Sequence, residues 1–192
     1  MQRNFSRAMA RNKPTDKRIE QEEPTWYACY TKSRAEKAVY QRLMQSEVEC
    51  YLPLRRTRRK WSDRMKWVDE PLFKSYIFVR IIPSEYADVV KIEGIYKFVT
   101  FESKAVPIPE SQINAIRLLL GQDAILEVTT ERIPQGQAIE VQAGPLIGLQ
   151  GELVQYRGNR KVLVRIGEIG QGLLVTIDPG LLMRVRKPGS GE

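Results

Sequence analysis

The sequence predicts a two-domain protein. The first is an α+β domain at residues 24–121, with an antiparallel or mixed sheet and flanking helices, and the second is a small β-barrel at residues 138–187. Up to Gly121, segments with the two-residue period of strands alternate with segments of helical period. Beyond Gly136 only short strand patterns separated by turn residues remain, which is typical of a small barrel. With 192 residues the chain is long enough for both.

The first domain is preceded by residues 1–23, a polar segment without sustained periodicity that we interpret as a disordered tail. The run TWYACYT, residues 25–31, is rich in aromatic and small residues and predicts a strand that is buried on at least one face. Residues 33–47 repeat an apolar residue at every fourth position, which predicts a helix. Ser33 and Glu36 have the spacing of a capping box at the start of this helix.

The rest of the first domain continues the alternation. VECYLPLR alternates like a strand, and its Pro53 favours a sheet edge or a bulge. The basic segment after it is predicted to be a loop or a hairpin extension. The predicted elements that follow are the strand YIFVRII (76–82), the helix SEYADVVKIEG (84–94), the strand IYKFVTF (95–101) and the helix PESQINAIRLLLG (109–121).

The second domain begins where the period changes. Pro134 and Gly136 mark a boundary, and we interpret residues 122–137 as a linker. Five short strands are predicted after it: AIEVQA, GELVQYR, RKVLVRI, LLVTI and LLMRV.

Composition narrows the class of function. The formal net charge is +8, which is compatible with nucleic acid, an acidic protein surface or a membrane face as a partner. Histidine is missing, and the two cysteines, Cys29 and Cys50, have no metal-like spacing, so we expect no metal and no cofactor. No run approaches the ~20 apolar residues of a membrane span, and the N-terminus lacks the apolar core of a signal peptide. We therefore expect a soluble cytoplasmic protein.

Several motifs together resemble a known family. WYACYTKSRAEKAV, PLFKSYIFVR and GIYKFVTFESKAVPIP, in this order, resemble the N-terminal domain of the NusG family of transcription elongation factors. VQAGPLIGLQGELVQYRGNRKVLVRI looks like a KOW motif, which implies an SH3-like barrel. The segment around KWSDRMKW is similar to that of the specialised UpxY-type antiterminators of polysaccharide operons. The sequence departs from the family at Lys74 and Ser75, where Pro-Gly or Pro-Asn is usual, so the turn there is less well specified.

An aromatic surface is the first candidate site. In YIFVR, Tyr76 and Phe78 share one face of a strand, while Ile77 and Val79 share the other. If a helical layer buries Ile77 and Val79, the aromatic residues are left on an open surface, which is typical of a partner site. The resemblance implies that the partner is the pair of clamp helices of the RNA polymerase largest subunit. The residues that it implies are Tyr30, Phe73, Tyr76, Phe78 and Phe101. The alternative is that these aromatics are simply core.

A basic hairpin is the second candidate site. Seven cations face one acid, Asp63, over twelve residues, and Trp61 or Trp67 could stack on an unpaired base. The resemblance implies a position near the transcription bubble, and hence contact with non-template DNA or nascent RNA. The candidate residues are Lys32, Arg34, Arg55, Arg56, Arg58, Arg59, Lys60, Trp61, Arg64 and Lys66. The alternative is a solvated loop whose tryptophans pack on their own domain.

The barrel carries the third candidate site. By resemblance it docks a ribosomal protein, a termination factor or RNA, through Leu146, Ile147, Arg157 and Arg160. Its β-branched alternation favours a barrel over a helical hairpin as the resting state.

These features predict a binding protein and not an enzyme. Histidine is absent, and there is no phosphate-binding loop, nucleophile motif or zinc signature. The preferred function is an elongation regulator that acts as an antiterminator, suppresses pausing and serves a particular operon. The alternative is a ribosome-associated RNA-binding protein, because KOW modules also occur there.

Overall fold

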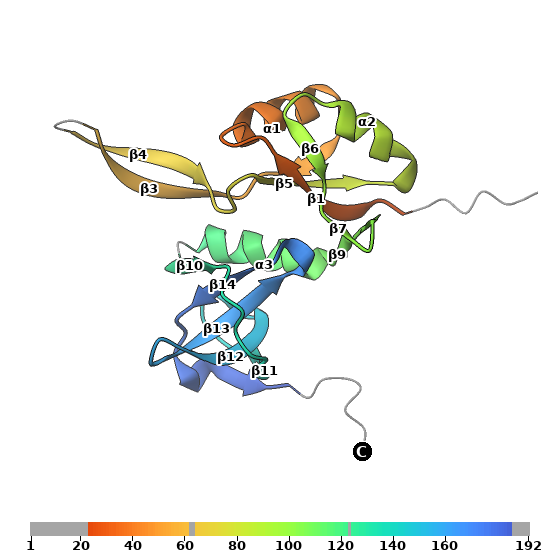
Figure 1. Cartoon of the computed structure of the whole chain (residues 1–192). Helices are drawn as coiled ribbons and strands as arrows, with labels where there is room; N and C mark the ends of the chain where they lie inside the picture. Colours follow the sequence, from red (N-terminus) through yellow and green to blue (C-terminus); the bar gives the residue numbers. More distant parts are fainter. Residues whose placement is uncertain (1–22, 62–63, 123, 186–192) are drawn as a thin grey trace, which may run out of the picture.

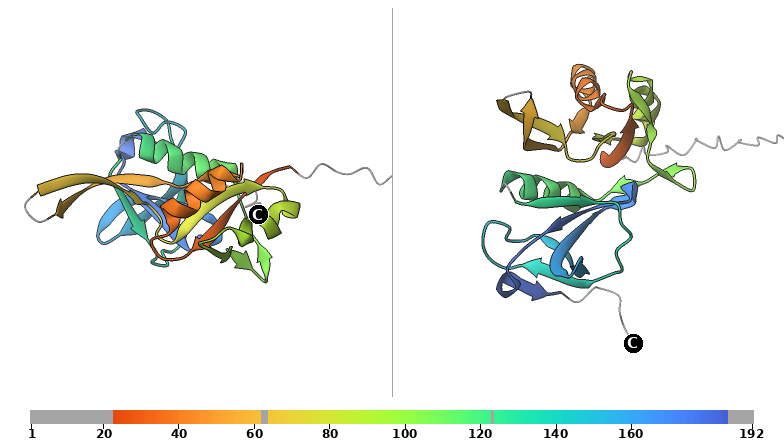
Figure 2. Two further views of the ribbon diagram at one scale, coloured as in Figure 1. Left: turned by 90° about the horizontal axis from the view of Figure 1, so that it is seen from above. Right: turned by 60° about the vertical axis from the view of Figure 1, so that its left-hand side comes forward.

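The computed structural model describes residues 23–61, 64–122 and 124–185 (Figure 1). The expected tail, apart from Glu23, lies outside the described residues. The fold has four layers: helices α1 and α2, the N-terminal sheet, helix α3, and the C-terminal barrel (Figures 1 and 2). The predicted combination of an α+β domain with a small barrel is confirmed.

The N-terminal sheet is antiparallel throughout. Its main strands have the order β2-β5-β1-β6, and β9 also pairs with β1. The bounds are β1 (Thr25–Thr31), β2 (Glu49–Tyr51), β5 (Tyr76–Ile81), β6 (Ile95–Phe98) and β9 (Pro107–Ile108). A small two-stranded sheet, β7 (Thr100–Phe101) and β8 (Lys104–Ala105), follows β6. The predicted strand at residues 25–31 is β1 itself.

One face of this sheet packs against two helices, α1 (Glu36–Gln45) and α2 (Tyr86–Lys91), the second of which follows a single 3₁₀ turn, η1 (Pro83–Glu85). Ile77, Val79 and Cys29 lie in the core cluster on this side, as do Val39 and Leu43 of α1. The prediction that Ile77 and Val79 face a helical layer is confirmed. Burial raises the pKa of the Cys29 thiol, which is consistent with a small apolar core residue and not a nucleophile.

The predicted capping box is wrong. Helix α1 begins only at Glu36, so Ala35 and not Ser33 precedes it, and no side chain caps it. Glu36 is buried, and its carboxylate instead accepts a hydrogen bond of 2.7 Å from the backbone N–H of Ser75. Because Ser75 is 39 residues away in sequence, no local pattern could indicate this contact.

The bond from Glu36 stabilises the turn before β5, which the sequence left poorly specified. Ser75 has φ of 63°, in the left-handed region that favours glycine. We expect Ser75→Gly to raise the free energy of unfolding by about 0.5–1 kcal/mol, because it relieves this conformation. The control is Ser111→Gly in the first turn of α3, where the backbone is helical, and this substitution should lower the free energy of unfolding. Denaturant unfolding measures both, and a destabilised Ser75→Gly protein would contradict this account.

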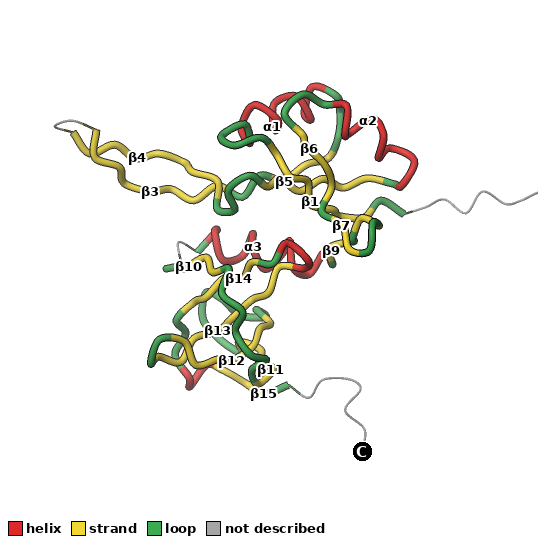
Figure 3. Tube along the Cα trace, in the orientation of Figure 1, coloured by secondary structure: helices red, strands yellow, loops and turns green. Residues whose placement is uncertain are grey.

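The basic segment forms a long hairpin that projects from the sheet domain (Figures 1 and 3). Its strands are β3 (Leu54–Trp61) and β4 (Arg64–Pro71), paired in register from Leu54 opposite Pro71 to Trp61 opposite Arg64. The expectation of a hairpin extension is confirmed.

The C-terminal barrel contains the five predicted strands and one more. The five are β11 (Gln137–Val141), β12 (Gln150–Tyr156), β13 (Asn159–Ile166), β14 (Gln171–Val175) and β15 (Leu182–Arg184). Two 3₁₀ turns, η2 (Gly167–Ile169) and η3 (Pro179–Leu181), precede β14 and β15. The added strand, β10 (Leu126–Thr129), pairs with β14. The interpretation of residues 122–137 as a linker is therefore wrong for β10, which extends the barrel sheet.

Helix α3 (Glu110–Gly121) lies between the sheet and the barrel (Figure 1). Its Ile113, Ile116 and Leu119 are fully buried in a core cluster that includes residues of both domains. The guanidinium carbon of Arg117 lies 5.4 Å from the ring of Trp26 and 5.1 Å from that of Tyr51 on the sheet. The two domains therefore share one apolar core in this conformation.

Candidate partner and nucleic-acid surfaces

The aromatic residues predicted to form an open surface differ in their exposure: some are buried, some half-buried and one is exposed. Register places Tyr76 and Phe78 opposite Tyr30 and Ala28, on the sheet face that is turned away from α1. Phe78 is 0% exposed and Phe73 is 1% exposed, and their rings meet edge to face with centroids 6.0 Å apart. The expectation that Phe78 is open to solvent is therefore wrong in this conformation, because both rings lie in the core cluster shared with α3 and the barrel.

Tyr30 and Tyr76 are the half-buried members of the set. Their ring centroids are 4.8 Å apart. The Tyr76 hydroxyl donates a long hydrogen bond of 3.4 Å to the carbonyl of Ile169 in η2 of the barrel, and burial raises the pKa of Tyr76 to about 12. The barrel therefore abuts this tyrosine pair directly.

Phe101 is 60% exposed on the β7–β8 hairpin, at the opposite end of the sheet from the basic hairpin (Figure 1). Among the ring contacts of the described residues, none joins Phe101 to the other four candidates. Phe101 thus lies apart from the tyrosine pair.

Sequence reasoning missed Tyr96, which is 69% exposed on β6. The ammonium of Lys97 lies 5.8 Å from the ring centroids of both Tyr96 and Tyr30. The register between β1 and β6 shifts between Tyr30 and Thr31, which allows two consecutive β6 residues to be exposed. Strict alternation could not predict this. We call Tyr30, Tyr76, Tyr96 and Lys97 the tyrosine patch.

The basic hairpin has two distinct faces. Residues directly opposite each other in the ladder share a face, which puts Arg56, Arg58, Lys60, Met65 and Trp67 together. We call this the tryptophan face. Trp67 is 57% exposed, and the guanidinium carbons of Arg56 and Arg58 lie 5.2 and 5.4 Å from its ring centroid. An exposed ring flanked by cations can stack on an unpaired base.

The other face of the hairpin contacts the body of the protein at its base. Arg55 donates a 3.0 Å hydrogen bond to the carbonyl of Leu126 in β10, so it holds the hairpin against the barrel strand. Arg59 forms a 2.6 Å ion pair with Glu70, and the hydrogen bond from Arg59 lowers the pKa of that carboxyl. Arg64 and Lys66 share this face and are exposed. The side chain of Trp61 lies outside the described part of the structure.

Lys32 and Arg34 are exposed at the junction between β1 and α1. Arg34 has a left-handed backbone, with φ of 62°. The structure brings Arg34 close to the base of the hairpin, since both line one cleft, whereas Lys32 does not line it.

The candidate residues of the barrel also differ in their exposure. Ile147 is 61% exposed and Arg160 is exposed, while Leu146 packs against the core cluster. Gly148, beside Ile147, has φ of 82°, a left-handed conformation that favours glycine. Ile147 and Arg160 therefore remain available to a partner.

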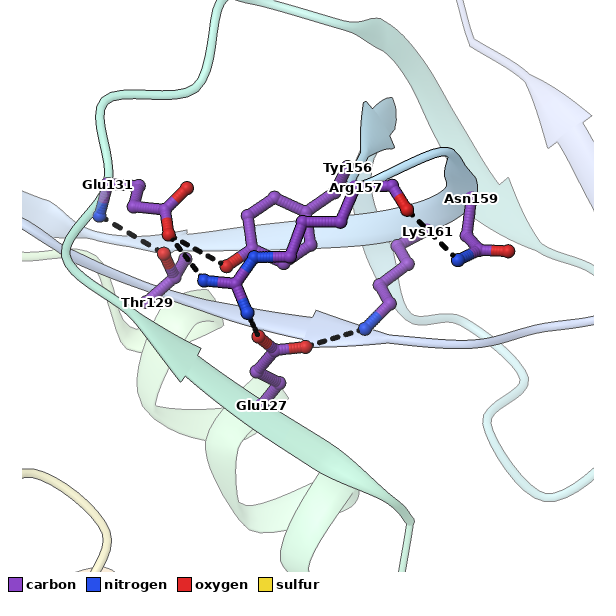
Figure 4. Close-up of polar contacts among 7 residues, drawn as sticks. All are labelled: Glu127, Thr129, Glu131, Tyr156, Arg157, Asn159 and Lys161. Carbon is purple, nitrogen blue, oxygen red and sulfur yellow. Dashed lines mark hydrogen bonds and ion pairs between the residues drawn. The ribbon is translucent and has the colours of Figure 1, made fainter.

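Arg157 is engaged within the barrel (Figure 4). Its guanidinium bonds Glu131 at 2.7 Å and Glu127 at 3.5 Å, and it lies 4.8 Å from the ring centroid of Tyr156. Lys161 binds Glu127 at 2.6 Å, and this contact lowers the pKa of Glu127. These contacts tie β10, and the segment after it, to the β12–β13 turn. They give Arg157 a structural role in this conformation.

None of the helices in the described part of the chain is long and apolar enough to cross a membrane. The described residues also contain no group of three or more His, Cys, Asp or Glu side chains that could hold a metal ion.

Comparisons with known proteins show what the chain is similar to. The chain is 23% identical over 153 residues to the transcription termination/antitermination protein NusG of Streptococcus pyogenes serotypes M3 and M1, which covers 72% of this chain and 84% of each relative. A solved structure of Thermotoga maritima NusG, described as showing a domain interaction, has a TM-score of 0.49 and 20% identity, and the match covers 85% of this chain and 98% of that one. Residues 24–117 match the family described as "Transcription termination factor nusG". This part of the chain therefore belongs to the NusG family.

Proposed function

We propose that the protein is a transcription elongation regulator that acts as an antiterminator. The tyrosine patch binds RNA polymerase, and the β3–β4 hairpin contacts nucleic acid beside it. Binding that favours the elongating conformation over the paused one suppresses pausing and termination, because a ligand shifts an equilibrium by its difference in affinity for the two states. The NusG-family domain at residues 24–117 supports this function.

The observation that carries the polymerase contact is the pair formed by Tyr30 and Tyr76, whose rings lie 4.8 Å apart beside Lys97. Tyrosine is a favoured anchor in protein interfaces, and Tyr96 adds exposed aromatic area on β6, the strand next to β1. We propose that the partner is the pair of clamp helices of the largest subunit. Phe73 and Phe78 lie beneath the patch and support it, while Phe101 lies outside it.

The hairpin supports the nucleic-acid contact. It projects from the sheet domain and exposes Trp67 between Arg56 and Arg58 (Figure 1). Non-template DNA or nascent RNA near the polymerase offers both phosphates and unpaired bases. We further propose that the barrel recruits a ribosomal protein or a termination factor through Ile147 and Arg160, and that the role is specific to a polysaccharide operon.

Polymerase binding is the test of this function. Tyr76→Ala in the full-length chain should weaken the affinity for purified host RNA polymerase by about 1–3 kcal/mol, since the ring is an anchor of the patch. Titration followed by fluorescence anisotropy measures the affinity, and transcription past a terminator measures the activity. The control is Tyr86→Ala in α2, a tyrosine that packs against the opposite face of the sheet, which should leave the affinity unchanged if the variant folds.

Two results would remove the proposal. If the folded Tyr76→Ala protein binds polymerase as tightly as the wild type, Tyr76 does not belong to the site. If the wild-type chain binds no polymerase but recovers ribosomal proteins or RNA from host lysate, the function is that of a ribosome-associated RNA-binding protein.

A further inference from the structure

We propose that a cleft between the base of the β3–β4 hairpin and the start of α1 binds the phosphate backbone of a single-stranded nucleic acid. The inference rests on the nucleic-acid contact in the proposed function and gives it a location. The cleft has a volume of about 700 Å³, which is in the usual range for ligand sites.

Three separate parts of the chain supply cations to this cleft. Arg34 and Lys37 come from the start of α1, Arg59 and Lys66 from the hairpin, and Lys74 from the turn before β5. All five side chains are exposed. Lys37 and Lys74 were not among the residues singled out in the sequence, because they lie far from the basic segment and from each other.

The acidic residues of the cleft are largely occupied by other contacts. Glu36 is buried and accepts the Ser75 N–H, and Glu70 is paired with Arg59 at 2.6 Å. Asp69, the third acid that lines the cleft, is opposite Arg56 in the hairpin ladder. The lining of the cleft thus carries five cationic side chains and three carboxylates, and this excess of positive charge favours an anionic ligand.

The walls of the cleft are held in a defined geometry. Both Arg34 and Ser75 line it and both have left-handed backbones, with φ of 62° and 63°. Such conformations are unfavourable for residues other than glycine and persist where the surrounding structure fixes them. The Glu36–Ser75 hydrogen bond fixes the turn that carries Lys74. The cations are thus presented on a preformed surface.

The cleft also continues onto the hairpin, which suggests an extended ligand. Arg59 and Lys66 line the cleft, and Arg64 lies further out on the same hairpin face. A strand of nucleic acid can follow this row of cations with its phosphates. An acidic peptide also carries negative charge. The length of this row of cations favours a nucleic acid, whose phosphates are regularly spaced. The tryptophan face, on the opposite side of the hairpin, is the competing location.

Oligonucleotide binding by the full-length chain tests this inference. The probes are fluorescein-labelled oligothymidylate and oligouridylate of twelve nucleotides, titrated at several salt concentrations. Lys37→Gln/Lys74→Gln should weaken binding roughly tenfold and reduce the slope of log K against log salt by about 1.4, since each lost contact to a single strand accounts for about 0.7. Lys91→Gln/Lys104→Gln removes the same charge from exposed lysines elsewhere and should change affinity less than twofold.

Each other outcome identifies what failed. If Arg56→Gln/Arg58→Gln abolishes binding while the cleft variant binds normally, the cleft is overturned, but nucleic-acid binding by the hairpin stands. If the wild type binds neither oligonucleotide, both the cleft and the nucleic-acid half of the proposed function are wrong, whereas polymerase binding is tested separately. Binding of poly-glutamate that depends on Lys37 and Lys74, with no oligonucleotide binding, would assign the cleft to an acidic polypeptide.

Discussion

Phe78→Ala is expected to lower the free energy of unfolding by about 3–5 kcal/mol, the usual cost of removing a phenylalanine from a packed core. Phe78 is fully buried, and its ring contacts those of Phe73 and Tyr51, with centroids 6.0 and 6.4 Å away. The surrounding side chains come from the sheet, from α3 and from the barrel, so the cavity would lie in the core that joins both domains. Denaturant unfolding monitored by tryptophan fluorescence measures the change.

Phe101→Ala is the matched control, because it removes the same side chain from a position that is 60% exposed. We expect a change within about 0.5 kcal/mol there. A small loss for Phe78→Ala would mean that α3 and the barrel do not cover this sheet face in solution. In that case Phe78 would be accessible and would belong to the partner surface, as the sequence alone predicts.

Ile169→Asp is expected to raise the affinity for RNA polymerase about tenfold. Ile169 is 5% exposed in the shared core cluster, and its carbonyl oxygen accepts a hydrogen bond from the hydroxyl of Tyr76. A buried and unpaired carboxylate costs several kcal/mol, so the substitution should release the barrel from the sheet domain. If the docked barrel hinders access to Tyr76, the apparent affinity of the wild type equals the affinity of the open form multiplied by the fraction of open molecules. A tenfold gain corresponds to about 1.4 kcal/mol of docking free energy.

Solution scattering should show a larger radius of gyration for Ile169→Asp, and circular dichroism should show that the barrel is retained. Ile147→Asp is the control, since this residue is 61% exposed and should affect neither shape nor polymerase affinity. If Ile169→Asp opens the molecule and polymerase affinity stays the same, the docked barrel does not restrict the tyrosine patch. If the molecule stays closed, the domain contact does not depend on η2.

The elements of the fold were largely predictable from local patterns. Strand β1 coincides with TWYACYT, and the five barrel strands lie where alternation and turn residues indicated them. The opposite orientations of Ile77 and Tyr76 follow from the two-residue period of a strand, which needs no knowledge of the partner layers. The charge of the basic segment could also be read from the sequence, which left a loop and a hairpin as alternatives, and the pairing of β3 with β4 makes it a hairpin.

The composition of the candidate surfaces was decided by contacts between distant residues. A strand pattern shows that Phe78 faces away from α1, but it does not show whether that face meets solvent or another layer. Docking of α3 and the barrel buries Phe78 and leaves Tyr76 only partly accessible. Strand β10 likewise acquires its place by pairing with β14, about fifty residues later in the chain.

The cleft has the same origin. Lys37, Lys66 and Lys74 become neighbours only because the hairpin base, the start of α1 and the turn before β5 fold together. The bond from Glu36 to Ser75 joins two of these parts across 39 residues. Periodicity reports the orientation of a side chain within its own element. Its neighbours depend on how the elements pack, and packing is a property of the whole chain.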